Sequence, residues 1–295
     1  MIDVVITSFK EPKTIGRAIE GFLKQDVKEK TKIWVVAPDE ETLNVAKKYK
    51  NVGTFVDPGK GKSFALNEIL GKLKGDIIVL SDGDVFVEDN SLKYILELFE
   101  NPKMGCVTGR PVSIDSRQTV FGYWSHLLCD AGAHGARLKR AKKREFLECS
   151  GYYWAFRNKV IKEFPLDVAE DTVVPFLFKE KGYEIGYADK AKVYVGFPKN
   201  LREFIEQKKR TAKAHDTLGK YVDIKNIPKT KSFKNELFEG HRALFYPKTM
   251  KEVIYTLGLF PTRLYIWALV FYHTRFKGSH YEDAWTRIES TKQYK

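Results

Sequence analysis

Four short runs rich in β-branched residues alternate with helix-like stretches through the first hundred positions. The runs are DVVITSF (3–9), KIWVVA (32–37), VGTFVD (52–57) and DIIVL (76–80). Between the first two, apolar residues recur at the spacing of one helix face, at Ile15, Ile19, Phe22 and Leu23. Repeated strand–helix–strand units of this kind build a mostly parallel sheet with buried strands. The pattern therefore predicts an α/β fold whose ligands bind beyond the carboxyl ends of the strands.

The rhythm changes after about residue 104. Two strand-like runs, 106–114 and 151–158, enclose a polar, basic helical stretch over roughly 115–147, so we expect a mixed sheet with an inserted helical element. From residue 216 the sequence is aromatic and basic without regular alternation. A chain of 295 residues with 43% hydrophobic composition can bury a large core. We predict one domain over 1–215 and a helical region over 216–295.

Composition narrows the choice of partner. The net charge of +13 favours an anionic partner, which includes nucleic acid, a phospholipid surface and a phosphorylated small molecule. Cys106, Cys129 and Cys149 are too scattered for a disulfide framework or a zinc site, so we expect buried thiols. The opening MIDVVITSF has no secretory leader pattern, and we expect the chain to fold in the cytoplasm.

Two carboxylates two positions apart follow the fourth strand-like run, in the sequence SDGD. Gly83 permits a bend between Asp82 and Asp84 at the edge of the sheet where ligands bind. Hard divalent ions such as Mg²⁺ use one or two carboxylates together with phosphate oxygens. The pair therefore indicates a metal-assisted diphosphate site, and the alternative is an ordinary polar turn.

The sequence DPGKGKSFALN (57–67) contains a glycine-rich, basic turn before a helix. It is not a Walker A motif, because Val56 stands where that motif needs a glycine. Lys60 and Lys62, with the amide groups at the start of the helix, would suit a diphosphate. The alternative is a flexible surface turn.

Two further segments carry candidate catalytic groups. Glu170 and Asp171 open a predicted helix, where they act either as first-turn acids or, for one of them, as a general base. After an expected cap at Asn200, Gln207 and Arg210 lie three apart on one helix face. Cations there would either be solvated or stabilise a diphosphate leaving group.

In order along the chain, five features resemble the inverting nucleotide-sugar glycosyltransferases of family 2, which have the GT-A fold and include a synthase-like branch. The resemblance spans roughly residues 2–215. The features are TSFKE, VVAPDEET, GKGKSFALN, SDGD, and AED followed by Q-x-x-R. The resemblance implies a GT-A, Rossmann-like mixed sheet and transfer of a sugar to an acceptor hydroxyl.

The resemblance also implies individual roles. Asp84, with Asp82, would hold Mn²⁺ or Mg²⁺, and Asp82 would also face the ribose. Asp171, next to Glu170, would be the catalytic base. The nucleotide contacts would be Thr7, Glu11, Asp39, Lys62 and Asp82, and the acceptor or diphosphate contacts would be Gly151, Tyr152, Trp154, Gln207 and Arg210. The two aromatic residues suit sugar stacking but also suit a core.

Two departures from the family pattern affect specificity. The sequence APDEE differs from the usual paired aspartates, which weakens any inference about which nucleotide base the donor carries. The synthase branch has a tryptophan after Q-x-x-R where this chain has Thr211, which weakens the case for a processive polymer synthase. We expect a UDP-sugar donor, with a GDP-sugar as the alternative.

The region 253–278 is the most apolar part of the chain. Pro261 and Arg263 divide it and leave about ten uninterrupted residues, whereas a spanning helix needs ~20. We expect it to lie at a membrane interface, to be buried, or to contact a partner. With the basic run RLKRAKKR (137–144) it suggests an enzyme peripheral on the cytoplasmic face of an anionic membrane, acting on a lipid-linked or glycan acceptor.

Other classes fit the sequence less well. A nucleotidyltransferase that makes nucleotide sugars would need a glycine-rich, arginine-bearing loop after the first strand, where this chain has TSFKEPKT. Nucleic-acid binding is suggested by charge alone, because no helix-turn-helix, zinc-finger or RNP-like pattern is present, and we expect no nucleic-acid partner.

Overall fold

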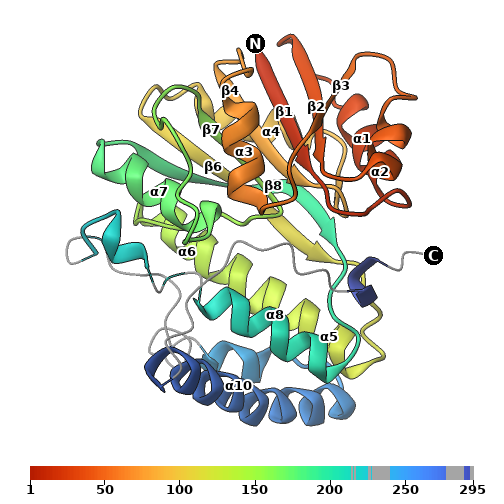
Figure 1. Cartoon of the computed structure of the whole chain (residues 1–295). Coiled ribbons are helices and arrows are strands. Elements are labelled where there is room, and N and C mark those ends of the chain that lie inside the picture. The colour runs from red at the N-terminus through yellow and green to blue at the C-terminus, as the bar shows by residue number, and fades with distance from the viewer. Residues whose placement is uncertain (214, 216, 225–226, 228–239, 277–288, 293–295) are drawn as a thin grey trace.

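A computed structural model describes residues 1–213, 215, 217–224, 227, 240–276 and 289–292 (Figure 1). In this part of the chain eight strands form one sheet, in the order β3-β2-β1-β4-β7-β6-β8-β5. The strands are β1 (Ile2–Thr7), β2 (Thr31–Ala37), β3 (Val52–Val56), β4 (Ile77–Asp82), β5 (Phe86–Val87), β6 (Met104–Ser113), β7 (Tyr153–Arg157) and β8 (Glu184–Val195).

Most strands of the sheet point the same way. β1 pairs in parallel with β2 and β4, and β2 pairs in parallel with β3. β7 is antiparallel to both β4 and β6, and β6 is parallel to β8, so β6 and β8 share the direction of the first four strands. The short β5 lies antiparallel to β8 at the edge. The predicted mixed, mostly parallel sheet is confirmed, and six carboxyl ends meet at one edge.

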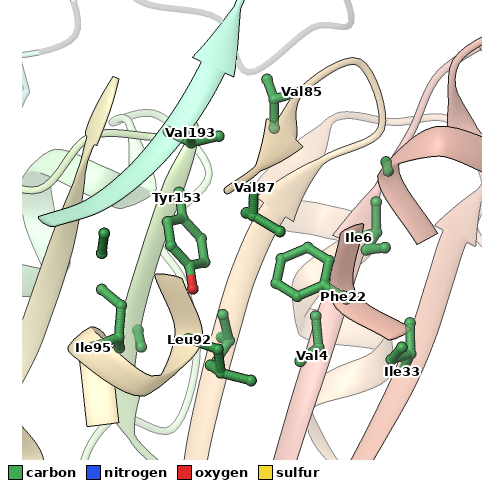
Figure 2. Close-up of a cluster of buried hydrophobic side chains, with 14 of the residues drawn as sticks. Val4, Ile6, Phe22, Ile33, Val85, Val87, Leu92, Ile95, Tyr153 and Val193 are labelled. Atoms are coloured by element: carbon green, nitrogen blue, oxygen red, sulfur yellow. The ribbon is translucent and has the colours of Figure 1, made fainter. Parts of the chain in front are cut away.

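Helices cover both faces of the sheet. Successive residues of β1 face opposite sides, so Val4 and Ile6 join one buried cluster and Val5 joins the other. The first cluster includes buried residues of α1 (Ile15–Leu23), α2 (Glu40–Ala46) and α4 (Ser91–Phe99). Figure 2 shows Phe22 of α1 among the side chains of this cluster. The second cluster includes α3 (Lys62–Leu70) and α7 (Glu170–Glu180).

A third layer of helices lies beyond the carboxyl edge of the sheet (Figure 1). It consists of α5 (Val120–Leu127), α8 (Leu201–Lys213) and α10 (Met250–Phe276), which share an apolar cluster of their own. A π-helical turn, η1 (Leu128–His134), leads from α5 into α6 (Gly135–Lys142), and this is the inserted helical element that the sequence predicts. The short 3₁₀ turns are η2 (Leu218–Lys220), η3 (Gly240–Phe245) and η4 (Glu289–Lys292).

The expectation that Pro261 and Arg263 divide the apolar C-terminal region is wrong. α10 runs without a break from Met250 to Phe276. Packing against the neighbouring helices supports the helix around the proline, and Thr262 Oγ1 donates a hydrogen bond to the carbonyl oxygen of Gly258 (2.9 Å). In the described residues α10 is long and apolar enough to cross a membrane over Met250–Tyr272. This is weak evidence, because core helices of soluble proteins meet the same criterion.

The basic run 137–144 is partly turned toward the protein. Arg137 donates to the carbonyl oxygens of Glu148 and Cys149, and Arg140 donates to that of Phe146. These two cations therefore stabilise a neighbouring loop. The three cysteines are buried thiols, as the sequence predicts. The domain boundary at residue 215 stays a prediction, although α8 and α10, which lie on its two sides, share one core.

Replacing Phe22 by alanine should destabilise the fold through a cavity in the first cluster. Phe22 is 4% exposed and its ring contacts that of Tyr153. We expect a loss of about 3–5 kcal/mol in the free energy of unfolding, measured by urea denaturation. Leu23→Ala is the matched control, because the neighbouring side chain is 47% exposed and should change stability by at most about 0.5 kcal/mol. Equal losses for both variants would contradict this assignment of the core.

Candidate active site

The site begins where β1 and β4 end side by side. Thr7 is paired with Asp82, and Thr7 Oγ1 donates a hydrogen bond to Asp82 Oδ1 (3.3 Å). The next amide, that of Gly83, donates to the carbonyl oxygen of Thr7 (2.8 Å). Two of the predicted nucleotide contacts therefore lie next to each other at the carboxyl edge of the sheet.

Gly83 is required by the close approach of β1. A Cβ atom at this position would lie 2.4 Å from Ser8 Oγ. A side chain here would therefore push the SDGD turn away from the end of β1. Asp84 is the next residue after this close approach of Gly83 to Ser8, and it is half-buried.

Lys62 connects three segments that are distant in sequence. From the first residue of α3, its ammonium group lies 2.7 Å from Asp82 Oδ1 and 2.9 Å from Glu170 Oε1. It also donates to the carbonyl oxygen of Gly151 (3.2 Å). An ammonium has three N–H donors, and these three acceptors can use all of them. Lys62 therefore acts in this structure as an internal counter-ion, which differs from the predicted contact with a diphosphate.

Opposing effects set the protonation of this cluster. Burial alone would lower the pKa of Lys62, but the charges of Asp82 and Glu170 outweigh burial and raise the pKa above its ordinary value. Burial raises the pKa of Glu170; Lys62 opposes that shift, and the negative charges of Asp171 and Asp82 add to it. Lys62 is therefore held in its charged form, and Glu170 takes up a proton at a higher pH than an ordinary glutamate.

Asp171 faces the same loop as Lys62. The amide of Gly151 donates a hydrogen bond to Asp171 Oδ2 (2.8 Å). Both acids lie in the first turn of α7, where the helix dipole favours negative charge. Glu170 is buried in its ion pair, whereas Asp171 is half-buried and keeps contact with solvent. Of the two, Asp171 is the carboxylate better placed to meet a substrate.

The predicted nucleotide contacts Asp39 and Glu11 are held by local structure. Asp39 caps α2 by accepting from the amide of Thr42 (2.9 Å), and it also accepts from the amide of Lys10 (2.7 Å). Burial would raise the pKa of Asp39, but the bonds from Thr42 and Lys10 outweigh burial and lower it. Glu11 is buried and accepts a hydrogen bond from Thr14 (3.1 Å). Both carboxylates lie near the end of β1.

Asp57 is a candidate that the sequence reasoning missed. It follows β3 at the same edge and is 3% exposed, and its Oδ1 accepts from the amide of Gly59 (2.7 Å). Among the described residues its buried Oδ2 has no hydrogen-bond partner. Burial raises the pKa of Asp57; Gly59 opposes the shift, and the charge of Asp39 adds to it. The signal available in the sequence was its position after the third strand run, equivalent to that of Asp82 after the fourth.

Tyr152 interacts electrostatically with three predicted site residues. Burial raises the pKa of its hydroxyl; the charges of Asp84 and Asp82 add to the shift, and that of Arg210 in α8 opposes it. Arg210 is exposed, and its predicted neighbour Gln207 is half-buried. In the described part of the chain Gln207 Oε1 is buried without a hydrogen-bond partner. Asn200 caps α8 as predicted, through a bond from the amide of Glu203 (3.0 Å).

Trp154 does not line this site. Its side chain is fully buried in the second cluster, and it lies in β7 between Leu80 of β4 and Thr108 of β6. A residue with no exposed surface offers no stacking face to an acceptor, so the interpretation as a core residue holds in this structure. Alternation along β7 explains the difference, since Trp154 points away from the face of its neighbour Tyr153.

The carboxylates at the edge of the sheet fit a divalent cation only together with a substrate. No group of three or more His, Cys, Asp or Glu side chains in the described residues is arranged to hold a metal. Asp82 and Asp84 supply two carboxylates, and Mg²⁺ or Mn²⁺ commonly uses one or two with phosphate oxygens completing the shell. Because Asp82 Oδ1 accepts from Lys62 and Thr7, Asp84 is the principal candidate ligand.

The curated sequence relatives are synthases of a sugar polymer. Poly-beta-1,6-N-acetyl-D-glucosamine synthase from Staphylococcus epidermidis is 24% identical over 236 residues, which cover 74% of this chain and 55% of the relative. The synthase of the same name from Staphylococcus aureus is 25% identical over 250 residues, which cover 79% and 58%. The chain therefore spans a little over half the length of these relatives.

Solved structures show the same fold. The mannosyltransferase PcManGT from Pyrobaculum calidifontis, in complex with GDP-Man and Mn²⁺, superposes with a TM-score of 0.60 at 16% identity. The alignment covers 94% of this chain and 81% of that one. Residues 1–349 of Staphylococcus aureus TarS superpose with a TM-score of 0.50 at 15% identity, covering 95% and 93%. The predicted GT-A fold is confirmed.

A family model decides the assignment. The model described as glycosyltransferase like family 2 matches residues 2–214, which is most of the chain and includes every predicted site residue. This confirms the predicted enzyme class, a glycosyltransferase. The chain belongs to glycosyltransferase family 2.

Proposed function

We propose that the chain transfers a sugar from a nucleoside diphosphate to an acceptor hydroxyl with inversion at the anomeric carbon. The observation that carries the proposal is the meeting of SDGD with the first turn of α7. Lys62 contacts Asp82 and Glu170 at once, so the acids proposed for the donor and the acid proposed for the acceptor border one site.

The donor would bind along the carboxyl edge of the sheet. Its nucleoside would lie near Thr7, Glu11 and Asp39, at the ends of β1 and β2. Its diphosphate would lie near Asp84. Arg210 of α8, whose charge acts on Tyr152, would be a cationic contact in addition to the metal ion. Bound Mn²⁺ or Mg²⁺ would be held by Asp84 and Asp82 and would neutralise charge on the departing diphosphate.

Asp171 would act as the general base. As the acceptor oxygen attacks the anomeric carbon, its proton passes to the carboxylate of Asp171 and the bond from carbon to the diphosphate oxygen breaks. The amide of Gly151 holds Asp171 Oδ2 (2.8 Å) and so fixes the orientation of the base. A single displacement from the opposite face inverts the configuration. The products are the glycosylated acceptor and a nucleoside diphosphate.

Lys62 would serve this reaction by holding the site together. Its contacts with Asp82, Glu170 and the carbonyl of Gly151 keep the SDGD turn, α7 and the Gly151 loop in fixed relation. A fixed relation between donor and base matters because misplacement of the reacting groups is costly in rate. This role replaces the diphosphate contact that the sequence suggested.

The acceptor would be a lipid-linked or glycan hydroxyl at the cytoplasmic face of a membrane. The names of the sequence relatives, which are synthases of an N-acetylglucosamine polymer, support a glycan acceptor. The UDP-sugar donor rests on the family resemblance of the sequence. The mannosyltransferase PcManGT, whose structure contains GDP-Man, makes a GDP-sugar the alternative. Thr211 in place of the synthase tryptophan favours single addition over processive polymer synthesis.

Replacing Asp171 by asparagine should remove transfer and keep donor binding. We expect the rate of sugar transfer to fall by ~10²–10⁴, because the amide cannot accept the proton. A thermal-shift titration with UDP- and GDP-sugars and Mn²⁺ should give the same stabilisation for both proteins. Glu163→Gln is the matched control, since Glu163 is an exposed carboxylate outside the site. Transfer by Asp171→Asn at the normal rate would remove the proposed base.

Replacing Lys62 by methionine should destabilise the protein by leaving buried carboxylates without a counter-ion. Side-chain exposure is 14% for Lys62 and 6% for Glu170, so solvent cannot compensate. We expect the free energy of unfolding to fall by about 3 kcal/mol at neutral pH, measured by urea denaturation. Lys60→Met, at an exposed lysine two residues earlier, should have little effect.

The loss caused by Lys62→Met should shrink in acid. A carboxyl whose folded-state pKa is raised, as for Glu170, takes up its proton at a higher pH in the folded protein than in the unfolded chain. Protonation removes the unpaired charge, so the stability difference from wild type should narrow as the pH falls from neutral toward 4.5, the ordinary pKa of a glutamate. A difference that stays constant over this range would contradict the counter-ion role.

A further inference from the structure

One side of α10 is apolar and open to solvent. At helical spacing, the exposed residues include Ile254, Leu257, Leu264, Tyr265, Phe271 and Tyr272, which we call the α10 outer face. Their exposed fractions run from 50% to 66%, and only 22% of the most apolar stretch of α10 is buried inside the protein. Phe245 of η3, preceding α10, is 85% exposed. A continuous apolar patch of this length marks an interaction surface.

The opposite side of α10 is fixed to the protein along most of its length. Near the start of the helix, Arg117 forms an ion pair with Glu252 (2.8 Å), and Trp124 Nε1 donates to the carbonyl oxygen of Tyr255 (2.6 Å). Tyr123 and Thr256 share a hydrogen bond of 2.7 Å. Further along, Leu259, Ile266 and Val270 are buried in the third cluster. The outer face is therefore presented by a firmly packed helix.

This packing is incompatible with α10 crossing a bilayer. The buried positions extend from Glu252 to Val270, about 27 Å at the rise of an α-helix. A spanning α10 would draw α8 into the hydrocarbon, and α8 carries exposed charges at Arg202 and Arg210. The helix can instead lie flat, with its outer face in the lipid and its inner face on the protein.

The charges around α10 favour an anionic partner. Between residues 240 and 272 the only acidic residue is Glu252, which faces inward and pairs with Arg117. Lys248 and Lys251 are exposed at the start of the helix, and Lys251 Nζ also donates to the carbonyl oxygen of Gln118 (3.0 Å). A second copy of the chain docked on the same face would bring these like charges together, whereas anionic headgroups would complement them.

We propose that the α10 outer face docks in the plane of an anionic lipid bilayer. The apolar and aromatic side chains would enter the boundary of the acyl chains, and Lys248 and Lys251 would meet the headgroups. α5 and α8 lie between α10 and the carboxyl edge of the sheet (Figure 1), so docking would place the active site on the side of the domain that faces the membrane. This surface is independent of the roles proposed for Asp171 and Asp84.

Flotation of the full chain with vesicles tests the proposal. Vesicles of phosphatidylcholine with about 30% phosphatidylglycerol should bind the wild type, and raised salt should weaken binding without abolishing it. The variant Leu257→Ser/Leu264→Ser/Phe271→Ser should lose at least about tenfold in partitioning, because three apolar contacts with lipid are removed. Lys248→Glu/Lys251→Glu should bind several-fold more weakly and lose most of the salt dependence.

A matched triple variant controls for surface polarity in general. Leu23→Ser/Val56→Ser/Leu166→Ser changes three apolar side chains that are exposed on the α/β domain, and it should float as the wild type does. Donor stabilisation in a thermal-shift assay should be unchanged in all variants, which separates loss of docking from loss of the proposed transferase site. If the α10 triple variant floats with the vesicles to the same extent as the wild type, the proposal is overturned.

Two further results would also overturn it. If sedimentation velocity shows that the wild type is a dimer and the α10 triple variant a monomer, with equal binding to vesicles, the outer face is an interface between copies. If alkaline carbonate fails to release the wild type from vesicles, α10 crosses the bilayer. Complete release by carbonate with a monomeric wild type supports in-plane docking.

Discussion

The ammonium group of Lys62 is the interaction on which the active site depends. It joins the first residue of α3 to Asp82 at the end of β4, to Glu170 at the start of α7 and to the carbonyl of Gly151. Without this charge, two carboxylates and the charge of nearby Asp171 would repel one another inside the protein. Lys62 is thus a structural counter-ion for the two acids. In this arrangement its three N–H donors face protein acceptors and not a ligand.

The sheet explains why acids gather at one edge. Six of its strands end on the same side, so Asp39, Asp57 and Asp82, at or just after the ends of three different strands, lie along one edge although they are far apart in sequence. The concentration of negative charge needs compensation, and the backbone amides of Lys10, Thr42 and Gly59 supply part of it. The compensated edge remains a suitable place for a cation and a diphosphate.

The third helical layer gives this α/β domain an unusual exterior. α5 and α8 close over the inner stripe of α10, and the partly buried ion pair of Arg117, which precedes α5, with Glu252 ties the start of α10 to this layer. Burying one stripe leaves the other apolar stripe exposed to solvent. The same helix therefore completes a core on one side and offers a hydrophobic surface on the other, with α5 and α8 lying between it and the edge of the sheet that carries the candidate site (Figure 1).

The sequence by itself determined the βαβ alternation, the strand ends that carry Asp82 and Asp84, and the order of the family motifs, because these are local patterns of apolar spacing and turn residues. The tertiary structure decided the rest. Trp154 became a core residue through strand alternation, Lys62 became a counter-ion, Asp57 emerged as a buried acid, and α10 stayed continuous through Pro261. Each of these outcomes depends on neighbours distant in the chain, since burial, charge compensation and helix support come from packing. The position of Asp57 after a strand run indicated its place at the edge of the sheet but not its burial.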